Sequence, residues 1–207
     1  MEMNDEKLKT LAITLRWEAR YRQGEHLTGE GAFLPELATL DRDFAEALDR
    51  FGVRRGRLLE IGTGVGRQAI CYARAGFEVT AVDVSATAIE QARRHAEMAG
   101  LGADTLRFAA DNILHTGLKD RFDVIADRGC YATLKVWEWP VYARNVHGLL
   151  KPDGLFLLKI NAGQQKRLGP LEAYFLIEQS YDTHYHGEPR QGPPAGFFIL
   201  KPIFVRG

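Results

Sequence analysis

Three closely spaced glycines and one aspartate carry the strongest chemical signal in this sequence. Gly62, Gly64 and Gly66 follow the apolar run that ends at residue 61, and Asp83 ends a second apolar run. Glycines let a backbone turn sharply and approach a ligand, and the helix expected after them offers free N–H groups. An acidic side chain about 20 residues after such a turn can accept hydrogen bonds from two ribose hydroxyls. The pattern predicts a nucleotide-like cofactor at the carboxyl ends of a parallel sheet.

The residues around the turn discriminate between cofactors. A dinucleotide site spaces its glycines G-x-G-x-x-G, whereas here the third glycine, Gly66, comes one residue early. Glu60 stands just before the turn, where a carboxylate would repel a pyrophosphate in a partly dry site. A cationic ligand end suits Glu60 better. S-adenosylmethionine has such an end, because it carries an ammonium and a sulfonium and no phosphate.

Residues 60–66 read E-x-G-x-G-x-G and resemble the first motif of the class I S-adenosylmethionine-dependent methyltransferases. The resemblance covers residues 55–160 and implies that S-adenosylmethionine is the cofactor. In this resemblance Asp83 holds the ribose, and Asp111 meets the adenine amino group. The cofactor-binding set that it implies in the turn and at the ends of the next two strands is Glu60, Gly62, Gly64, Gly66, Asp83, Val84, Asp111 and Asn112.

The segment before the sheet also resembles a known group. Trp17, Arg20, Tyr21 and Gly24 form W-x-x-R-Y-x-x-G, which is similar to the opening of small methyltransferases related to the thiopurine and tellurite-resistance enzymes. The resemblance implies a helical lid in which Trp17 and Arg20 contact the cofactor, and the glycines within residues 29–31 would let this lid move. The alternative is that Trp17 and Tyr21 only pack the helix.

Asp127-Arg128-Gly129 follows the apolar run 122–126 and looks like the D-R-G of the same group. The resemblance implies that Arg128 lies near the methyl acceptor, where it would orient an anionic acceptor or stabilise a thiolate. Asp127 would accept a hydrogen bond from the ammonium of the cofactor. These two residues are the candidate catalytic residues. The alternative is a surface arginine that pairs with Asp127.

The expected reaction is in-line attack of an acceptor lone pair on the sulfonium methyl group, which positioning and exclusion of water can promote. A hydroxyl or amine acceptor needs a base, whereas an ionised thiol needs none. We expect a small-molecule acceptor with a sulfur, oxygen or nitrogen nucleophile. Trp137 and Trp139 either line the acceptor pocket or anchor a loop. The alternatives are a protein or RNA methyltransferase and a non-catalytic S-adenosylmethionine-binding protein.

Charge and length limit the class of function. The 207 residues contain 27 basic and 27 acidic side chains, whereas nucleic-acid binders usually carry a basic face. We therefore expect no nucleic-acid partner. The chain starts with charged rather than apolar residues, and no apolar run approaches the ~20 residues that span a bilayer. These features predict a cytoplasmic protein without a membrane segment.

The cysteines and histidines do not predict a metal site. Cys71 and Cys130 form neither a disulfide framework nor a zinc motif. Cys130 is expected to be a small buried apolar residue. His184 and His186 would share one strand face, but a solvated outer face is favoured because no third ligand is evident. We expect no metal.

Alternating helices and strands define the expected fold. The chain is predicted to be one domain, with N-terminal helices and a lid in residues 1–54 and a Rossmann-like core in residues 55–207. Helices are expected to cover both faces of the sheet. Apolar periodicity predicts helices near residues 8–19, 37–48, 65–75, 86–99 and 140–149, and strands near residues 57–61, 79–83, 105–109, 122–126 and 155–160.

The last part of the chain changes character. Residues 170–179 are predicted to be helical, and residues 180–186 and 195–203 to be strands. The turn-rich segment between these strands is too short for a crossover helix, so they should pair antiparallel. The result is an α/β fold with a seven-stranded sheet and an antiparallel last strand. Such a strand is characteristic of class I methyltransferases and foreign to dinucleotide dehydrogenases.

Overall fold

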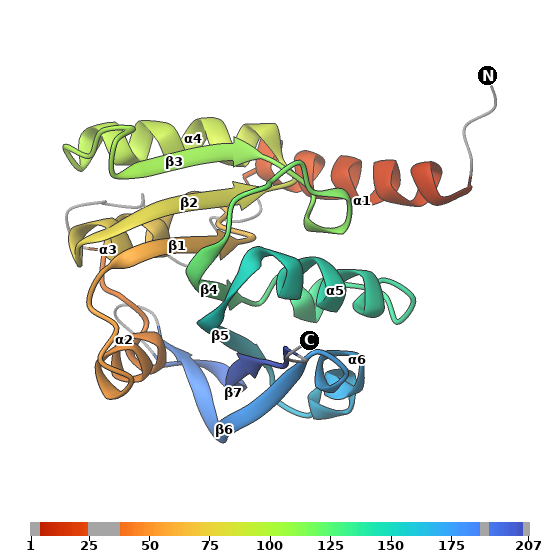
Figure 1. The fold of residues 1–207 in the computed structure, drawn as a ribbon. Helices are drawn as coiled ribbons and strands as arrows, with labels where there is room; N and C mark the ends of the chain where they lie inside the picture. The colour runs from red at the N-terminus through yellow and green to blue at the C-terminus, as the bar shows by residue number, and fades with distance from the viewer. Residues whose placement is uncertain (1–4, 25–37, 187–190, 205–207) are drawn as a thin grey trace.

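The computed structural model describes residues 5–24, 38–186 and 191–204 (Figure 1). Its centre is one seven-stranded sheet with the order β3-β2-β1-β4-β5-β7-β6. Neighbouring strands from β3 to β5 pair parallel, and β7 pairs antiparallel with both β5 and β6. The predicted fold class is confirmed. The strands are β1 Gly56–Ile61, β2 Phe77–Asp83, β3 Leu106–Ala110, β4 Phe122–Arg128, β5 Leu150–Asn161, β6 Phe175–His186 and β7 Gln191–Pro202.

The α-helices and short 3-10 helices flank this sheet. Ser85 caps α4, because its side chain accepts a hydrogen bond from the amide of Ala88. A proline lies in the first turn of α5, where its missing N–H leaves no helical bond unmade. The helices are α1 Asp5–Arg22, α2 Arg42–Arg50, α3 Arg67–Arg74, α4 Ala86–Met98, α5 Trp139–Leu149, α6 Gly169–Glu172, η3 Ile113–His115, η4 Tyr131–Thr133 and η5 Gln165–Leu168.

Both faces of the sheet are buried, which explains the continuous apolar runs of its central strands. Successive side chains point to opposite faces, so Leu58 packs with α2, α3 and α4 while Leu59 packs with α5. In β5, Leu155 and Leu157 face the first layer, and Phe156 and Leu158 face the second. The carboxyl ends of the parallel strands therefore meet at one edge between two helical layers.

Two predicted helices have different bounds in the structure. The helix expected over residues 170–179 is wrong after Glu172, because β6 begins at Phe175 and pairs with β7. Phe175 is buried and Leu176 is exposed, which is the alternation of a strand. The helix expected from residue 37 begins at Arg42, because Asp41 caps its first turn. Residue 37 itself lies outside the described residues.

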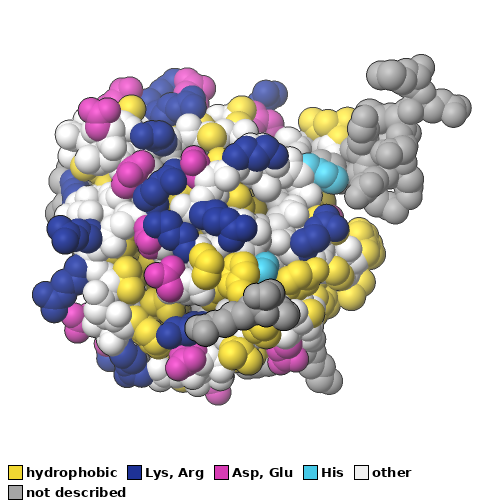
Figure 2. Space-filling view, viewed as in Figure 1, with side chains coloured by type: hydrophobic (Ala, Val, Ile, Leu, Met, Phe, Trp, Pro, Cys, Tyr) yellow, Lys and Arg dark blue, Asp and Glu magenta, His cyan; other side chains and the backbone are white. Residues whose placement is uncertain are grey.

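Charged side chains of both signs are interspersed on the face shown in Figure 2. Along the parts of the chain that the structure describes, no helix combines the length and apolarity that a membrane crossing requires.

Candidate functional site

A cavity of about 370 Å³ lies at the carboxyl edge of the sheet. Its wall includes the last residues of β1, β2, β4 and β5, namely Ile61, Asp83, Arg128 and Asn161. The strand order reverses between β1 and β4, which is where open α/β sheets bind their ligands. The remaining wall residues are Trp17, Tyr21, Gly62, Val82, Val84, Asp111, Ile113, Gly129, Cys130, Ala132, Thr133 and Tyr185.

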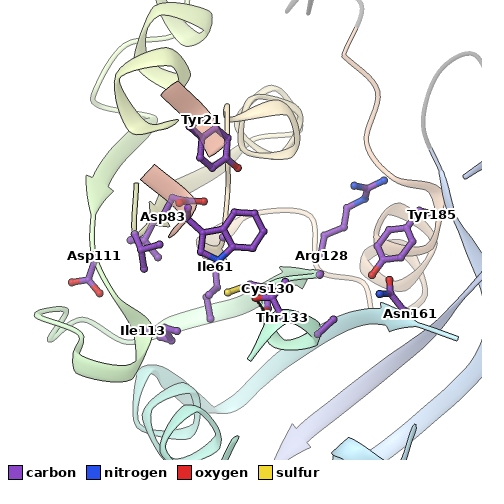
Figure 3. Close-up of a pocket in the computed structure, with 16 residues that line it drawn as sticks. Tyr21, Ile61, Asp83, Asp111, Ile113, Arg128, Cys130, Thr133, Asn161 and Tyr185 are labelled. Carbon is purple, nitrogen blue, oxygen red and sulfur yellow. Dashed lines mark hydrogen bonds between the residues drawn. The ribbon is translucent and has the colours of Figure 1, made fainter. Parts of the chain in front are cut away.

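The cavity has two chemically different ends (Figure 3). Asp111 and Ile113 lie at one end, and Arg128 and Tyr185 lie at the other. Cys130 lies between the ends. A ligand that fills the cavity therefore meets carboxylates at one end and a guanidinium with an aromatic ring at the other.

The predicted glycine turn is present, and it needs glycine. Gly62 and Gly64 have φ angles of 71° and 55°, which L side chains rarely adopt. A Cβ on Gly62 would lie 2.6 Å from the Cβ of Cys130, and a Cβ on Gly64 would lie 2.7 Å from the hydroxyl oxygen of Tyr21. Gly66 caps α3 and packs tightly against Phe108. Of the three glycines, Gly62 is the one that lines the cavity.

Asp83 lies in the cavity wall, and backbone groups fix its carboxylate. One oxygen accepts a hydrogen bond of 3.0 Å from the amide of Gly64, and the other accepts one of 3.0 Å from the amide of Ser85. Burial raises the pKa of this carboxyl, although these amide hydrogen bonds oppose the rise. Each carboxylate oxygen can accept a second donor. Two adjacent hydroxyls therefore fit the arrangement, and Val84 beside it also lines the cavity.

Asp111 and Asn112 offer an acceptor and a donor that no other described residue uses. One oxygen of Asp111 accepts from the amide of Gly117 at 2.9 Å, whereas its Oδ1 is buried without a hydrogen-bond partner among the described residues. Asn112 accepts from the amide of Leu114 through Oδ1, and its Nδ2 is similarly unpartnered. Buried polar groups usually have partners. Adenine has an amino donor and ring-nitrogen acceptors, so this pair fits an adenine edge.

Glu60 is not among the residues that line the cavity, and its expected contact with a cationic ligand end stays a prediction. Alternation along β1 points Ile61 into the cavity and Glu60 to the other face of the sheet. Glu60 is buried and accepts a hydrogen bond of 2.5 Å from the hydroxyl of Thr63. Burial raises its pKa to about 7. Glu60 therefore contacts the glycine turn through Thr63, on the face of the sheet away from the cavity.

Asp127 is also turned away from the cavity. It is fully buried, and it accepts hydrogen bonds from the amides of Cys130 and Tyr131 at 2.8 and 2.9 Å and from the hydroxyl of Tyr142 at 2.5 Å. Burial raises its pKa to about 6. Asp127 is not among the residues that line the cavity, and the expectation that it accepts from a ligand ammonium stays a prediction. Through these hydrogen bonds, Asp127 holds the backbone at Cys130 and Tyr131, which follow β4.

Arg128 lies in the cavity wall, and its expected place near the methyl acceptor stays a prediction. Its Nε donates to Asp41 at 2.9 Å, and its guanidinium carbon lies 5.1 Å from the ring centre of Tyr185. The side chain is 30% exposed. The alternative in which Arg128 pairs with Asp127 is wrong, because the ion-pair partner of Arg128 is Asp41.

A buried ion cluster of Lys159, Asp41 and Asp43 lies next to Arg128, and the sequence patterns did not predict it. Lys159 is fully buried, and its Nζ lies 2.6 Å from Asp41 and 2.5 Å from Asp43. Thr183 donates a further hydrogen bond to Asp43 at 2.9 Å. Burial opposes ionisation of Asp41, yet hydrogen bonds from Lys159 and Arg128 hold its pKa below the usual value. The signal was a lysine inside an apolar strand, since such a charge needs a partner.

Helix α1 lies over the cavity with Trp17 and Tyr21 in its wall. Arg20 does not line the cavity. Its guanidinium lies 4.9 Å from the ring centre of Trp17, which is a cation–π contact. Residues 29–31, whose glycines were expected to let a lid move, lie outside the described residues.

Trp137 and Trp139 lie outside the cavity wall, whereas Cys130 lies within it. Trp137 is exposed, and Trp139 donates from its indole nitrogen to the carbonyl of Leu134 at 3.3 Å. Trp139 therefore anchors the loop. Cys130 is half-buried in the cavity wall, and burial raises the pKa of its thiol well above the usual range. Within the described ranges, no three His, Cys, Asp or Glu side chains are grouped to hold a metal ion.

Comparison with known proteins identifies sequence relatives. Residues 58–154 match the family described as a methyltransferase domain. Ubiquinone biosynthesis O-methyltransferase from Actinobacillus pleuropneumoniae serotype 5b is 32% identical over 126 residues, which cover 58% of this chain and 50% of that protein. The protein of that name from Ruegeria pomeroyi is 35% identical over 124 residues, which cover 58% of this chain and 48% of that protein. The chain thus spans about half the length of the curated relatives it matches.

Solved structures share the fold at low identity. The 1,6-didemethyltoxoflavin-N1-methyltransferase of Burkholderia thailandensis, solved with 1,6-didemethyltoxoflavin and S-adenosylhomocysteine, gives a TM-score of 0.72 at 20% identity and covers 98% of this chain and 92% of its own. A structure from work on conversion of a disulfide into a thioacetal in echinomycin biosynthesis gives 0.77 at 20% identity, with 92% and 91% covered. A TehB-like S-adenosylmethionine-dependent methyltransferase from Corynebacterium glutamicum gives 0.63 at 16% identity, with 93% and 99% covered.

Proposed function

We propose that this chain, which carries a class I S-adenosylmethionine-dependent methyltransferase domain, transfers the methyl group of S-adenosylmethionine to a small-molecule acceptor. The observation that carries the proposal is the cavity with Asp83 and Asp111 in its wall, where Asp111 and the neighbouring Asn112, which is not itself in the wall, each have a buried polar atom without a partner among the described residues. These groups complement a ribose and an adenine. The motifs around Arg20 and Arg128 further support kinship with the small thiopurine and tellurite-resistance methyltransferases.

The residues divide between the two ends of the cavity. Asp83 would hold the ribose, and Asp111 with Asn112 would hold the adenine. Trp17 and Tyr21 would cover the bound cofactor and exclude water. S-adenosylmethionine supplies an electrophilic methyl group on a sulfonium. The acceptor would then enter at the end that contains Arg128, Asn161, Thr133 and Tyr185.

The residues at the end of the cavity that contains Arg128 support an acceptor whose nucleophilic atom needs no general base to remove a proton. Within the described residues, its wall contains no histidine or carboxylate. Burial raises the pKa of the Tyr185 phenol to about 12 and that of the Cys130 thiol well above the usual range. Neither group is a general base near neutral pH. Ionised thiols, acidic hydroxyls and ring nitrogens fit, and Arg128 can stabilise a developing or existing anion.

Relatives support a small acceptor. Two of the proteins named above are methyltransferases of ubiquinone biosynthesis and of 1,6-didemethyltoxoflavin. The balanced charge of this chain gives no support to a nucleic-acid acceptor.

Calorimetry and an acceptor screen test the proposal. S-adenosylhomocysteine should bind, and NAD should show no measurable binding. Release of S-adenosylhomocysteine should then be followed with thiols, phenols, amines and halides as acceptors. Tight NAD binding without S-adenosylhomocysteine binding would overturn the cofactor assignment. Activity confined to proteins or RNA, or binding without turnover of any acceptor, would favour the two alternative functions.

A further inference from the structure

Glu18 fastens α1 to the first turn of α4. Its carboxylate accepts hydrogen bonds from the Ser85 hydroxyl at 2.7 Å, from the Thr87 hydroxyl at 2.5 Å and from the Thr87 amide at 3.2 Å. Arg22, one turn further along α1, donates to the same carboxylate at 2.9 Å. The hydrogen bond from the Thr87 hydroxyl leads the causes that lower the pKa of Glu18 to about 2. The group is therefore ionised throughout the neutral range, and its hydrogen bonds are charge-assisted.

Ser85 connects this attachment to the cofactor end of the cavity. Its hydroxyl donates to Glu18, and its amide donates to Asp83 at 3.0 Å. The residue that positions the ribose-binding carboxylate therefore also holds α1. In the same helix, Trp17 immediately before Glu18 and Tyr21 one turn after it line the cavity.

The rest of α1 contributes few alternative attachments through its described apolar side chains. Leu11 and Leu15 are 43% and 57% exposed, so one face of the helix points to solvent. Ile13 packs against the core layer on the α5 side. Figure 1 shows that α1 extends beyond the sheet from its contact with α4. Glu18 thus supplies a polar attachment of α1 to the first turn of α4, in addition to the places of Trp17 and Tyr21 in the cavity wall.

We propose that Glu18 is a positioning residue that closes α1 over the cofactor, so that cofactor exchange requires its hydrogen bonds to Ser85 and Thr87 to break. The inference rests on the proposed function, because it takes the occupant of the cavity to be S-adenosylmethionine or its product. Docking of α1 and cofactor binding are then linked, and each favours the other by the same factor.

The test compares wild type with Glu18→Gln and Thr87→Val. Stopped-flow kinetics would measure dissociation of S-adenosylhomocysteine, and amide hydrogen exchange would report the protection of residues 11–22 with and without this ligand. Removing the charge of Glu18 or the hydroxyl donor of Thr87 should speed dissociation about tenfold or more. In wild type the ligand should increase protection of α1, and in both variants this increase should shrink. Glu46→Gln is the matched control, because Glu46 forms an exposed ion pair with Arg42 across one turn of α2.

The outcomes separate the two proposals. If wild type binds S-adenosylhomocysteine and both variants release it at the wild-type rate, Glu18 does not retain the cofactor and this inference alone fails. Equal protection of α1 in wild type with and without ligand overturns it as well. If wild type does not bind S-adenosylhomocysteine, the proposed function fails and the inference falls with it.

Discussion

Lys159 donates hydrogen bonds to both carboxylate oxygens of Asp41, at 2.6 and 2.9 Å, although 118 residues separate them in the chain. Both side chains are fully buried. Asp41 also accepts from Arg128, and Asp43 contacts the same ammonium. Arg128, which lines the cavity at the end opposite Asp111, is therefore held by Asp41. Asp41 is in turn held by Lys159 of β5.

Lys159→Met should destabilise the fold, because it leaves Asp41 and Asp43 buried with only part of their compensating charge. Breaking a buried pair in this way costs about 3–5 kcal/mol. Urea unfolding would measure the loss. Lys151→Met is the matched control, since Lys151 forms a partly exposed ion pair with Asp123 and should cost less than about 1 kcal/mol. Similar losses for the two variants would contradict the assigned importance of the buried cluster.

Asp83→Ala should weaken binding of S-adenosylhomocysteine by at least about tenfold, because hydrogen bonds to a charged acceptor contribute about 1.5–3 kcal/mol. Asp111→Ala should weaken it less, since Asp111 is proposed to contact a single adenine group whereas Asp83 is proposed to accept from two ribose hydroxyls. Calorimetry gives both affinities, and exposed Asp104 supplies the control Asp104→Ala. Wild-type affinity in Asp83→Ala would remove Asp83 from the ribose site.

Arg128→Ala should lower turnover or raise the KM for the acceptor, and it should change cofactor affinity by less than about threefold. The physical reason is its place at the end of the cavity opposite Asp111. Cofactor affinity and single-turnover methylation should be measured together once an acceptor is known. A variant that loses cofactor binding but handles the acceptor normally would move Arg128 into the cofactor site.

Glu60→Gln should flatten the dependence of stability on pH. Burial raises the pKa of Glu60 from 4.5 to about 7, so the folded state binds the proton more tightly than the unfolded state. The stabilisation is complete below pH 4.5 and is lost as pH rises through about 7, by on the order of 3 kcal/mol. Urea unfolding between these limits would measure the difference between wild type and variant. Parallel pH profiles would show that Glu60 is not the group that titrates.

The sequence predicts the sheet well, because its strands follow local rules, and the same rules predict which strand ends share one edge. Buried parallel strands are short apolar runs, and their carboxyl ends meet at one edge, which brings Asp83 and Asp111 to the same cavity. The outward direction of Glu60 also follows from a local rule, since its neighbour Ile61 faces the cavity. The predicted helix extends to residue 179 because local sequence patterns do not report the nonlocal pairing of β6 with β7, which begins at Phe175.

The acceptor end depends on contacts that spacing rules do not reach. Asp41 and Lys159 come together across the whole sheet, and Tyr185 reaches the cavity wall from β6, an edge strand of the final hairpin. Asp127 follows β4 as the resemblance requires, yet its carboxylate is consumed by Cys130, Tyr131 and Tyr142. A position in a motif fixes the place of a backbone, whereas the direction of a side chain depends on the surrounding packing.

The two ends of the cavity come from separate stretches of the chain. The cofactor end uses residues 61–113 and α1, whereas Arg128, Asn161 and Tyr185 of the acceptor end come from β4 and the strands after it. The outer hairpin of β6 and β7 adds Tyr185 without contributing to the glycine turn. Under the proposed function, a change in the C-terminal hairpin can therefore alter the acceptor end through Tyr185, while the residues proposed to hold the methyl donor stay unchanged.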